Sequence, residues 1–486
     1  MGKASSGSNK KGNSLSRNLF GRRIIYSSEP VITPDNVAAV VEQAYIDHLV
    51  NRDEIEYLWK YYRGDQPTLY RTRQTRPELV KRIVENRANS IVSFKVGYLA
   101  GKPIQYVASD SAKAVSESVK ALNDKMRVVG KYTKDKELIE WAMICGVGYR
   151  YMVQNNDPMI NSPFNLYTLD PRNTFVIRAN DFTRRVVAGV NYVTDRNENI
   201  TFTIYTEDGN AYRLKHGSGE LTKETNVFGR IPIIEYPANT ARMGCFELVL
   251  PLLDAINEFD SARNEAVEAF VQSLLVLYNC QVDEGTTADD IRAAGMILLK
   301  SVGDAKAEVK VIAEELNQTQ NQTLKDDMWN AVLQIVGMPS QASGSSSDSS
   351  NNGAIVLKNG WQGAETRATD FEAQFSLPEM ETLRIVSILC DAYANSGIRF
   401  APEDLEVKFT RRNYEDILSK SQTLVTMLNN DKVHPQKAYE ASGLFVDTEE
   451  AYQMGMSWYE EHGEQNQPQQ QNQPQQQEQK PVTADE

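Results

Sequence analysis

Residues 340–353 read SQASGSSSDSSNNG, a polar stretch rich in serine, asparagine and glycine. A segment with helical spacing of apolar residues ends just before it, at Met338-Pro339, and another runs from Ala354 to about Asn395. A loop of this length inside a compact domain is uncommon and is either functional or disordered. We therefore predict a functional loop held between two helices, with a surface linker as the alternative.

The neighbouring helices predict a projecting stalk. Helical spacing runs over residues 251–278 and resumes over 314–336, and the interval 281–312 between them predicts a small mixed insert, with a helix near 288–294 and strands at 296–300 and 308–312. Two helices with a small head between them project from a body. In the long helix that follows the loop, Pro378 predicts a kink at Leu377, because proline removes a backbone hydrogen bond.

The first stalk helix carries a group of carboxylates. At 100° per residue, four acids fall within roughly 80° of one another, opposite an arc of apolar residues: Asp254, Glu258, Glu265 and Glu268. We interpret Asp260 and Arg263, which interrupt the apolar arc, as members of an ion pair between helices. A metal site would need partner ligands such as Glu-x-x-His, which are missing, so a solvated acidic face is the stronger interpretation.

The rest of the chain predicts an α+β fold that is predominantly helical. Helices are expected over residues 33–50, 53–62, 77–99 and 132–145, from Asn413 onward, and from Asp447 to about His462. Short β-branched and aromatic segments predict strands at 149–153, 175–178, 186–193, 200–205, 211–214 and 405–410, with a hairpin turn at 207–210.

Composition limits the class of protein. The chain has 486 residues, so two or more domains or one elongated subunit are expected. Its 52 basic and 65 acidic residues give a net charge of −13, which argues against a surface that wraps nucleic acid by neutralising phosphates. No apolar stretch is long enough to cross a bilayer, which predicts a soluble protein without membrane contact.

Both ends of the sequence predict disorder, over a basic tail (1–30) and a glutamine-rich tail (463–486). The first six residues fit a myristoylation pattern, but a short pattern of this kind often arises by chance.

Motifs for catalysis and for cofactors are missing. The four cysteines and four histidines are scattered, so neither a disulfide framework nor a metal site is indicated. Residues 97–102, GYLAGK, have three residues between the glycines where a phosphate loop needs four, and Pro103 stands where it needs Ser or Thr. No nucleophile motif is present. We predict a protein that is not an enzyme and has no cofactor.

The order of these parts and several segments resemble the portal proteins of tailed bacteriophages, in the SPP1-like portal family. The resemblance covers about residues 33–460 and is carried by residues 86–89 with 97–106, 169–172, 231–236, Asn239 and 252–255. It implies a portal fold with wing, stem, clip and crown regions and a long kinked helix. The implied boundaries are wing 31–244, stem helices 245–278 and 313–339, clip 280–312, tunnel loop 340–353, kinked helix with a wing strand 354–410, and crown 411–462.

The resemblance also implies a function: a ring of twelve copies at one vertex of the capsid, through which double-stranded DNA is packaged and later ejected. The implied partners are further copies of the chain, DNA bound transiently and without sequence preference, the large terminase subunit, the major capsid and scaffolding proteins, and a head-completion or adaptor protein. The protein would lie in the virion, and in the host cytoplasm during assembly.

The implied site residues fall into four groups. The DNA-facing group in and after the tunnel loop comprises Ser343, Gly344, Ser347, Asp348, Asn351, Asn352 and Lys358. The channel lining comprises Asp254, Glu258, Glu265 and Glu268, the clip surface for the terminase comprises Asp289, Asp290, Arg292 and Lys300, and the helix kink is at Pro378.

A physical reason supports acidic lining. Each phosphate neutralised by a fixed cation would hold DNA and slow its passage, whereas carboxylates repel the duplex evenly. The alternatives are a structural or scaffold protein of the virion without a channel, and a packaging enzyme, which would need a nucleotide site that the sequence lacks.

Overall fold

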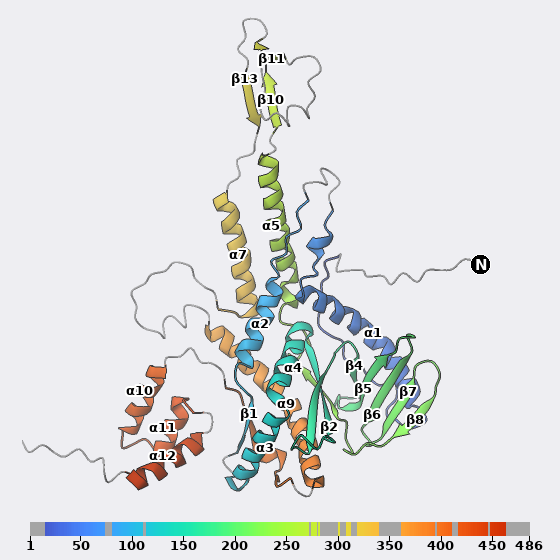
Figure 1. Ribbon diagram of the computed structural model, residues 1–486, viewed down its shortest axis with the longest axis vertical. Helices are drawn as coiled ribbons and strands as arrows, with labels where there is room; N and C mark the ends of the chain where they lie inside the picture. Colours follow the sequence, from blue (N-terminus) through green and yellow to red (C-terminus); the bar gives the residue numbers. More distant parts are fainter. Residues whose placement is uncertain are drawn as a thin grey trace, which may run out of the picture. The chain divides into compact units, whose positions relative to one another are not determined.

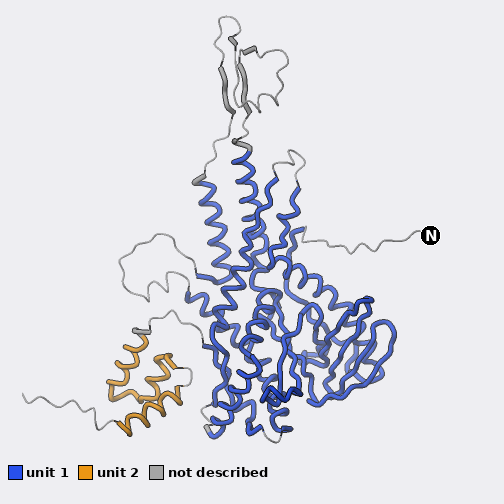
Figure 2. Tube along the Cα trace, in the orientation of Figure 1, with its two compact units in different colours: residues 1–412 blue, residues 413–486 orange. Residues whose placement is uncertain are grey.

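The computed structural model describes residues 15–72, 80–109, 113–271, 274–278, 280–281, 300–301, 308–312, 318–339, 361–393, 396–410, 417–445 and 448–462. The chain divides into two compact units, residues 1–412 and 413–486 (Figure 2). Apart from the last three helices, every element described below belongs to the first unit (Figure 1).

The first unit begins with helices. They are α1 (Val37–Tyr62), α2 (Arg87–Leu99), α3 (Ser116–Val128) and α4 (Lys131–Cys145). The sequence predicts two helices where α1 is continuous. Asn51, at the expected break, is buried, and its side chain binds both backbone groups of Arg23 (Nδ2 to O and N–H to Oδ1, 2.9 Å each), so it does not compete with the helix.

Two antiparallel sheets follow the helices. One has three strands in the order β3-β2-β9, with β2 Val147–Gln154, β3 Phe164–Leu169 and β9 Ile233–Pro237. The other has five strands in chain order: β4 Thr174–Arg178, β5 Val186–Thr194, β6 Ile200–Thr206, β7 Ala211–Lys215 and β8 Leu221–Glu224. The predicted strands and the hairpin turn between β6 and β7 are confirmed. β3, β8 and β9 were not predicted.

Helix α1 covers the five-stranded sheet (Figure 1). Its residues Val37, Val40, Val41, Ala44 and Tyr45 recur at helical spacing and pack with inward-facing strand residues into one buried cluster. A larger cluster joins α1, α2, α4, the three-stranded sheet and the later helix α9. The predicted α+β class, with helix predominant, is confirmed.

Helices α5 (Leu250–Val271) and α7 (Gln318–Val336), the pair predicted as the stem and called so below, lie side by side (Figure 1). The predicted helix to Tyr278 is wrong at its end. Residues 274–278 form strand β10, which pairs antiparallel with β13 (Glu308–Ile312), because this ladder satisfies the backbone groups of an apolar, β-prone run. The strand predicted at 308–312 is therefore confirmed, and the predicted helix at 288–294 lies outside the described residues.

Helix α7 ends in a Schellman motif. The N–H of Met338 donates to Leu333 O at 2.9 Å and that of Gly337 to Gln334 O at 3.3 Å, with Gly337 at φ 65°. The Gly-Met-Pro sequence after Val336 supplies the left-handed residue and the stop that this cap needs.

After the interval 340–360, which lies outside the described residues, α9 (Trp361–Ala392) begins. Pro378 lies inside α9, as predicted, and the kink at Leu377 stays a prediction. Strand β14 (Leu405–Lys408) pairs antiparallel with β1 (Gln105–Ala108).

The second unit consists of α10 (Ile417–Leu428), α11 (Pro435–Ser442) and α12 (Thr448–His462). The first and last of these were predicted. Helix α11 was not, since eight residues are too few for a periodic signal, although Pro435 at its first position and the capping His434 mark its start. Among the described helices, none has the length and apolar character that a membrane span requires.

Candidate functional site

An extended segment, residues 80–86, lies along one face of α5. Three of its backbone N–H groups donate to side chains of that helix: Lys81 to Glu265 Oε1 (3.1 Å), Ile83 to Ser261 Oγ (3.0 Å) and Glu85 to Asn257 Oδ1 (3.1 Å). Alternate residues of an extended chain lie about 6.7 Å apart and every fourth residue of a helix about 6 Å apart, so the two repeats match over three contacts. This face of α5 therefore packs against another segment of the same subunit and does not face solvent.

The same contacts explain why the helix predicted from Pro77 is wrong over residues 80–86. Helical spacing predicts that the N–H groups of Ile83 and Glu85 donate within a helix. In the structure they donate instead to polar side chains of α5, and the helix α2 begins only at Arg87.

Two of the four acids predicted to line a channel are buried within the subunit. Asp254 is 8% exposed, and its carboxylate accepts hydrogen bonds from the Tyr61 hydroxyl (2.7 Å) and the Ser16 hydroxyl (2.6 Å). Burial raises the pKa of Asp254. Glu265 is 4% exposed and pairs with the Arg71 guanidinium at 3.0 Å. Neither carboxylate lies on an exposed face of the subunit.

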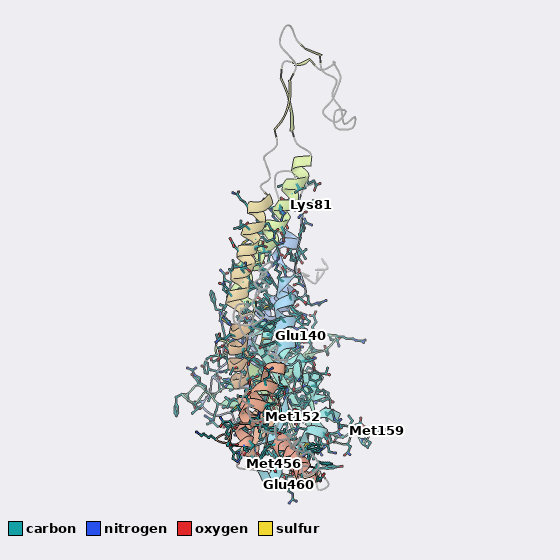
Figure 3. All side chains as sticks on the ribbon, turned by 90° about the vertical axis from the view of Figure 1, so that its left-hand side faces the viewer. Lys81, Glu140, Met152, Met159, Met456 and Glu460 are labelled. Atoms are coloured by element: carbon teal, nitrogen blue, oxygen red, sulfur yellow. The ribbon has the colours of Figure 1, made fainter. Side chains whose placement is uncertain are left out.

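The other two acids reach the surface. Glu258 is exposed, and Glu268 is partly exposed and pairs with Lys81 at 2.5 Å. Figure 3 shows Lys81 beside α5. The prediction of one solvated face with all four carboxylates is thus corrected, because α5 packs much of its polar side against the N-terminal segment, α1, Arg71 and residues 81–85. The sequence offered one indication that these acids are paired within the subunit: Arg71 and Lys81 are cations that need carboxylate partners.

The stem helices are joined by charge. Lys325 of α7 pairs with Asp260 of α5 at 2.9 Å and also with Glu85 of the extended segment. Arg263 of α5 reaches α7 too, and donates to Gln322 Oε1 at 3.2 Å. The interpretation that Asp260 takes part in an ion pair between helices is confirmed, with Lys325 as its partner.

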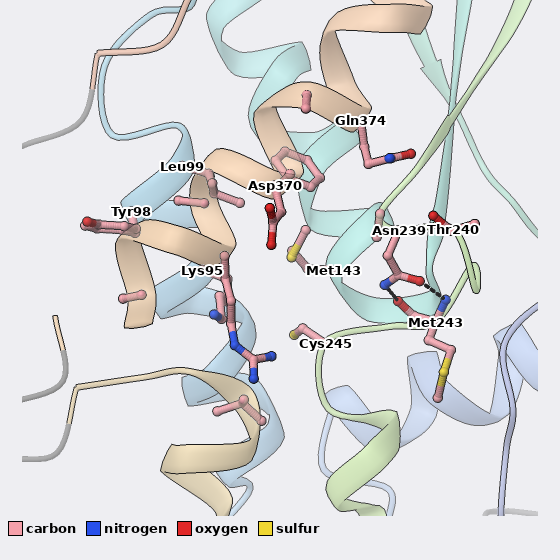
Figure 4. A pocket seen from close by; sticks show the side chains of 17 residues that line it. Lys95, Tyr98, Leu99, Met143, Asn239, Thr240, Met243, Cys245, Asp370 and Gln374 are labelled. Carbon is pink, nitrogen blue, oxygen red and sulfur yellow. Dashed lines mark hydrogen bonds between the residues drawn. The ribbon is translucent and has the colours of Figure 1, made fainter. Parts of the chain in front are cut away.

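Where α7 ends and α9 begins, the structure contains a pocket of about 500 Å³ (Figure 4). It is lined by residues of α2, α7 and α9 and of the turn that follows β9. Its charged side chains are Lys95, Arg367 and Asp370. The Lys95 ammonium donates to Gly337 O at 3.4 Å, and Arg367 packs on Gly337, where an added Cβ would lie 2.3 Å from its Cδ. The pocket thus touches both ends of the interval that holds the predicted tunnel loop.

The environment of Lys95 is unfavourable for a charge. The residue is 9% exposed, and burial is the main reason why the pKa of its ammonium is lowered to about 8. Cys245 acts in the opposite direction, and repulsion from Arg367 adds to the lowering.

A buried ionic network holds α9 to the body of the first unit. Glu379 of α9 pairs with Arg150 of β2 at 2.7 Å and with Lys131 of α4 at 3.0 Å. Asp135 of α4 pairs with both cations, so the network contains two positive and two negative groups. The hydroxyls of two tyrosines, Tyr106 and Tyr236, complete the hydrogen bonds of Glu379. The helix that follows the loop is thus fixed by charges from distant parts of the chain.

Most of the other predicted site residues lie outside the described part of the chain. These are all seven residues of the DNA-facing group and three of the four clip residues, Asp289, Asp290 and Arg292. The backbone of Lys300 pairs with Gln281 between β12 (Lys300–Ser301) and β11 (Cys280–Gln281). Their roles stay predictions. Within the described residues, no group of three or more His, Cys, Asp or Glu side chains could hold a metal ion.

Comparisons with known proteins give one strong similarity. The family described as "Phage portal protein, SPP1 Gp6-like" matches residues 43–472. No curated protein matches the chain. Among solved structures, a chain from "Neck of empty GTA particle computed with C6 symmetry" is 13% identical, with a TM-score of 0.43, over 74% of this chain and 90% of that chain. A likeness of this size carries no inference about function.

Proposed function

The chain belongs to the SPP1 Gp6-like family of phage portal proteins, which are structural components of the virion, and from this premise we propose that it forms the portal ring of a tailed phage. Twelve copies would surround a channel at one capsid vertex, through which double-stranded DNA enters during packaging and leaves during ejection. The observation that carries the proposal is the family match over residues 43–472, which spans both described stem helices.

In this proposal the channel is lined by Glu258 and Glu268, the two of the four predicted lining acids that reach the subunit surface. Carboxylates repel a passing duplex and hold no phosphate in place, which leaves DNA free to move. Because salt screens charges beyond about 10 Å, only a narrow channel would use this repulsion. Asp254 and Glu265 instead hold the stem to the body through Tyr61 and Arg71.

The DNA-facing residues of 340–353 would touch the duplex through weak contacts that do not depend on sequence. Serine and asparagine side chains suit hydrogen bonds to phosphate oxygens, and Lys358 is the only cation between Pro339 and Trp361. The cap of α7 and the ionic network of α9 support this role, because they fix both flanking helices.

The clip, residues 280–312, would bind the large terminase subunit during packaging and a head-completion protein afterwards. Asp289, Asp290, Arg292 and Lys300 would contribute to that surface. The major capsid and scaffolding proteins would surround the wing, and assembly would take place in the host cytoplasm.

Negative-stain electron microscopy of the purified protein tests the ring. We expect particles with a central hole and a mass, by native mass spectrometry, of about twelve copies of the 54.7 kDa chain. Particles without a central hole, or a protein that stays monomeric at the concentrations used in a DNA-packaging assay, would refute a portal ring.

A packaging assay tests the lining. Glu258→Lys with Glu268→Lys should leave ring formation intact and slow DNA filling, since cations in the channel would bind phosphates. The matched control is Glu220→Lys with Glu207→Lys, which reverses one exposed acid and one partly paired acid outside the stem. Equal packaging by both double variants would contradict the assigned lining.

A further inference from the structure

Two cations, Lys95 and Arg367, line the pocket where α7 ends and α9 begins, and Figure 4 labels Lys95 in it. Lys95 is buried and Arg367 is exposed. Within the described residues, neither forms an ion pair, and the only hydrogen bond of the Lys95 ammonium is the 3.4 Å contact with Gly337 O. Asp370 lines the same pocket but pairs with neither cation. The lining therefore carries two cations and one carboxylate, a net positive charge, and no described residue forms an ion pair with either cation.

Such an arrangement is costly unless a ligand completes it. An ammonium has three N–H donors, and a single long contact to a carbonyl uses one of them weakly. Burying an ion without a partner costs free energy, and placing a guanidinium near it adds repulsion. Both effects lower the pKa of Lys95 to about 8. An anion with several acceptor oxygens would accept hydrogen bonds from the ammonium and would offset both the cost of burial and the repulsion between the two cations.

The rest of the lining suits a small ion with water. Leu99, Met143, Val336 and Phe371 form apolar wall, and the small side chains Ala364 and Ala368 leave open space. A volume of about 500 Å³ exceeds that of one tetrahedral oxyanion, and the polar lining residues Tyr98, Asn239, Thr240 and Gln374 would bind ordered water in the remainder. A guanidinium offers paired N–H groups that match two oxygens of such an ion, and a lysine supplies a point charge.

We propose that Lys95 and Arg367 bind a free phosphate-class oxyanion between α2, the end of α7 and the first turns of α9. The ion would join α2, through Lys95, to α9, through Arg367, beside the Gly337 carbonyl that Lys95 contacts at the end of α7. This assignment rests on the geometry of one subunit and does not depend on the proposed ring.

Titration of the purified full-length protein with inorganic phosphate tests the site, by calorimetry in a buffer free of phosphate and sulfate. We expect saturable binding of one ion per chain. Lys95→Met keeps most of the apolar stem of the side chain and should weaken binding about tenfold or more, because it removes a charged hydrogen bond in a water-poor pocket. Arg367→Gln, at an exposed position, should weaken binding while leaving the fold unchanged, which keeps the test valid if Lys95→Met does not fold.

Lys102→Met is the matched control, since Lys102 is an exposed lysine just beyond the same helix and lies outside the pocket. It should bind phosphate like the unaltered protein. No saturable binding up to 50 mM phosphate, about 50-fold above a dissociation constant of about 1 mM, would overturn the proposal. Equal binding by the Lys95, Arg367 and Lys102 variants would overturn it as well.

A second arm identifies the source of the phosphate. A short DNA duplex added to the phosphate-loaded protein should leave the bound ion in place, because Lys95 is buried and a phosphate within a duplex cannot enter the pocket freely. If the duplex displaces the bound ion, and if Arg367→Gln abolishes this displacement, the site binds DNA phosphate, and the proposal of a site for the free ion is refuted.

Discussion

Removal of one charge from the buried network around Glu379 should strongly destabilise the first unit. Glu379 is fully buried, and Arg150 is 1% exposed. Burial alone would raise the pKa of the Glu379 carboxyl, but Arg150 and Lys131 more than offset this and hold it at about 2. Glu379→Gln keeps the size of the side chain, places an amide near two cations and leaves the network with one positive charge in excess.

The magnitude follows from the contacts. At 2.7 Å and an effective dielectric constant of 20, Coulomb's law gives about 6 kcal/mol for the pair between Glu379 and Arg150. Loss of the desolvation cost of the carboxylate offsets part of this, and breaking a buried pair by removing one partner costs about 3–5 kcal/mol. We therefore expect a loss of about 3–5 kcal/mol in the free energy of unfolding of this unit.

Urea unfolding followed by tryptophan fluorescence measures the loss. With an m-value of about 3 kcal/mol/M, the midpoint should fall by about 1–1.7 M. Glu381→Gln is the matched control two residues along the same helix, since Glu381 forms an exposed pair with Arg384 and should cost less than about 1 kcal/mol. Glu379→Leu combined with Arg150→Met should recover part of the loss, because Lys131 and Asp135 still pair.

Equal midpoints for Glu379→Gln and Glu381→Gln would refute this reasoning, since a network that contributes nothing cannot hold α9. A double variant less stable than Glu379→Gln alone would show that packing, rather than charge balance, sets the cost.

Two further predictions concern the same unit. Arg242→Met should move acid unfolding to higher pH in a circular-dichroism titration. Burial alone would raise the pKa of Glu235, but guanidinium groups hold this pKa at about 2, below its value in the unfolded chain. The carboxylate therefore stabilises the fold above about pH 4.5, and this stabilisation is lost as the pH falls toward 2. An unchanged midpoint pH of unfolding in Arg242→Met would argue against the pairing of Arg242 with Glu235. Gly146→Ala should lower the melting temperature far more than Gly217→Ala. Both glycines have positive φ, but an added Cβ would lie 2.1 Å from Arg242 O at the first and meets nothing within 4 Å at the second, so equal effects would contradict the steric cause.

Much of the fold could be predicted because its signals are local. Periodicity identified α4, α5, α7 and α9 and most strands of the five-stranded sheet, and the Gly-Met-Pro sequence after Val336 marked the end of α7. The boundaries failed where a segment takes its hydrogen bonds from elsewhere. Residues 80–86 donate to α5, and residues 274–278 pair with β13.

The sequence by itself determined the α+β class, the interrupted helical stem, the polar stretch between two helices and the resemblance that the family match bears out. A helical wheel shows which residues share a face, but it cannot show whether a polar face meets water or a polar partner. Only the tertiary structure decided that Asp254 and Glu265 are buried while Glu258 is exposed, and that Lys95 and Arg367 line one pocket. It also decided that the acids Asp135 and Glu379 are neutralised by the cations Lys131 and Arg150. The physical reason is that the burial and pairing of a charge depend on groups far away in sequence, whose positions no local repeat records.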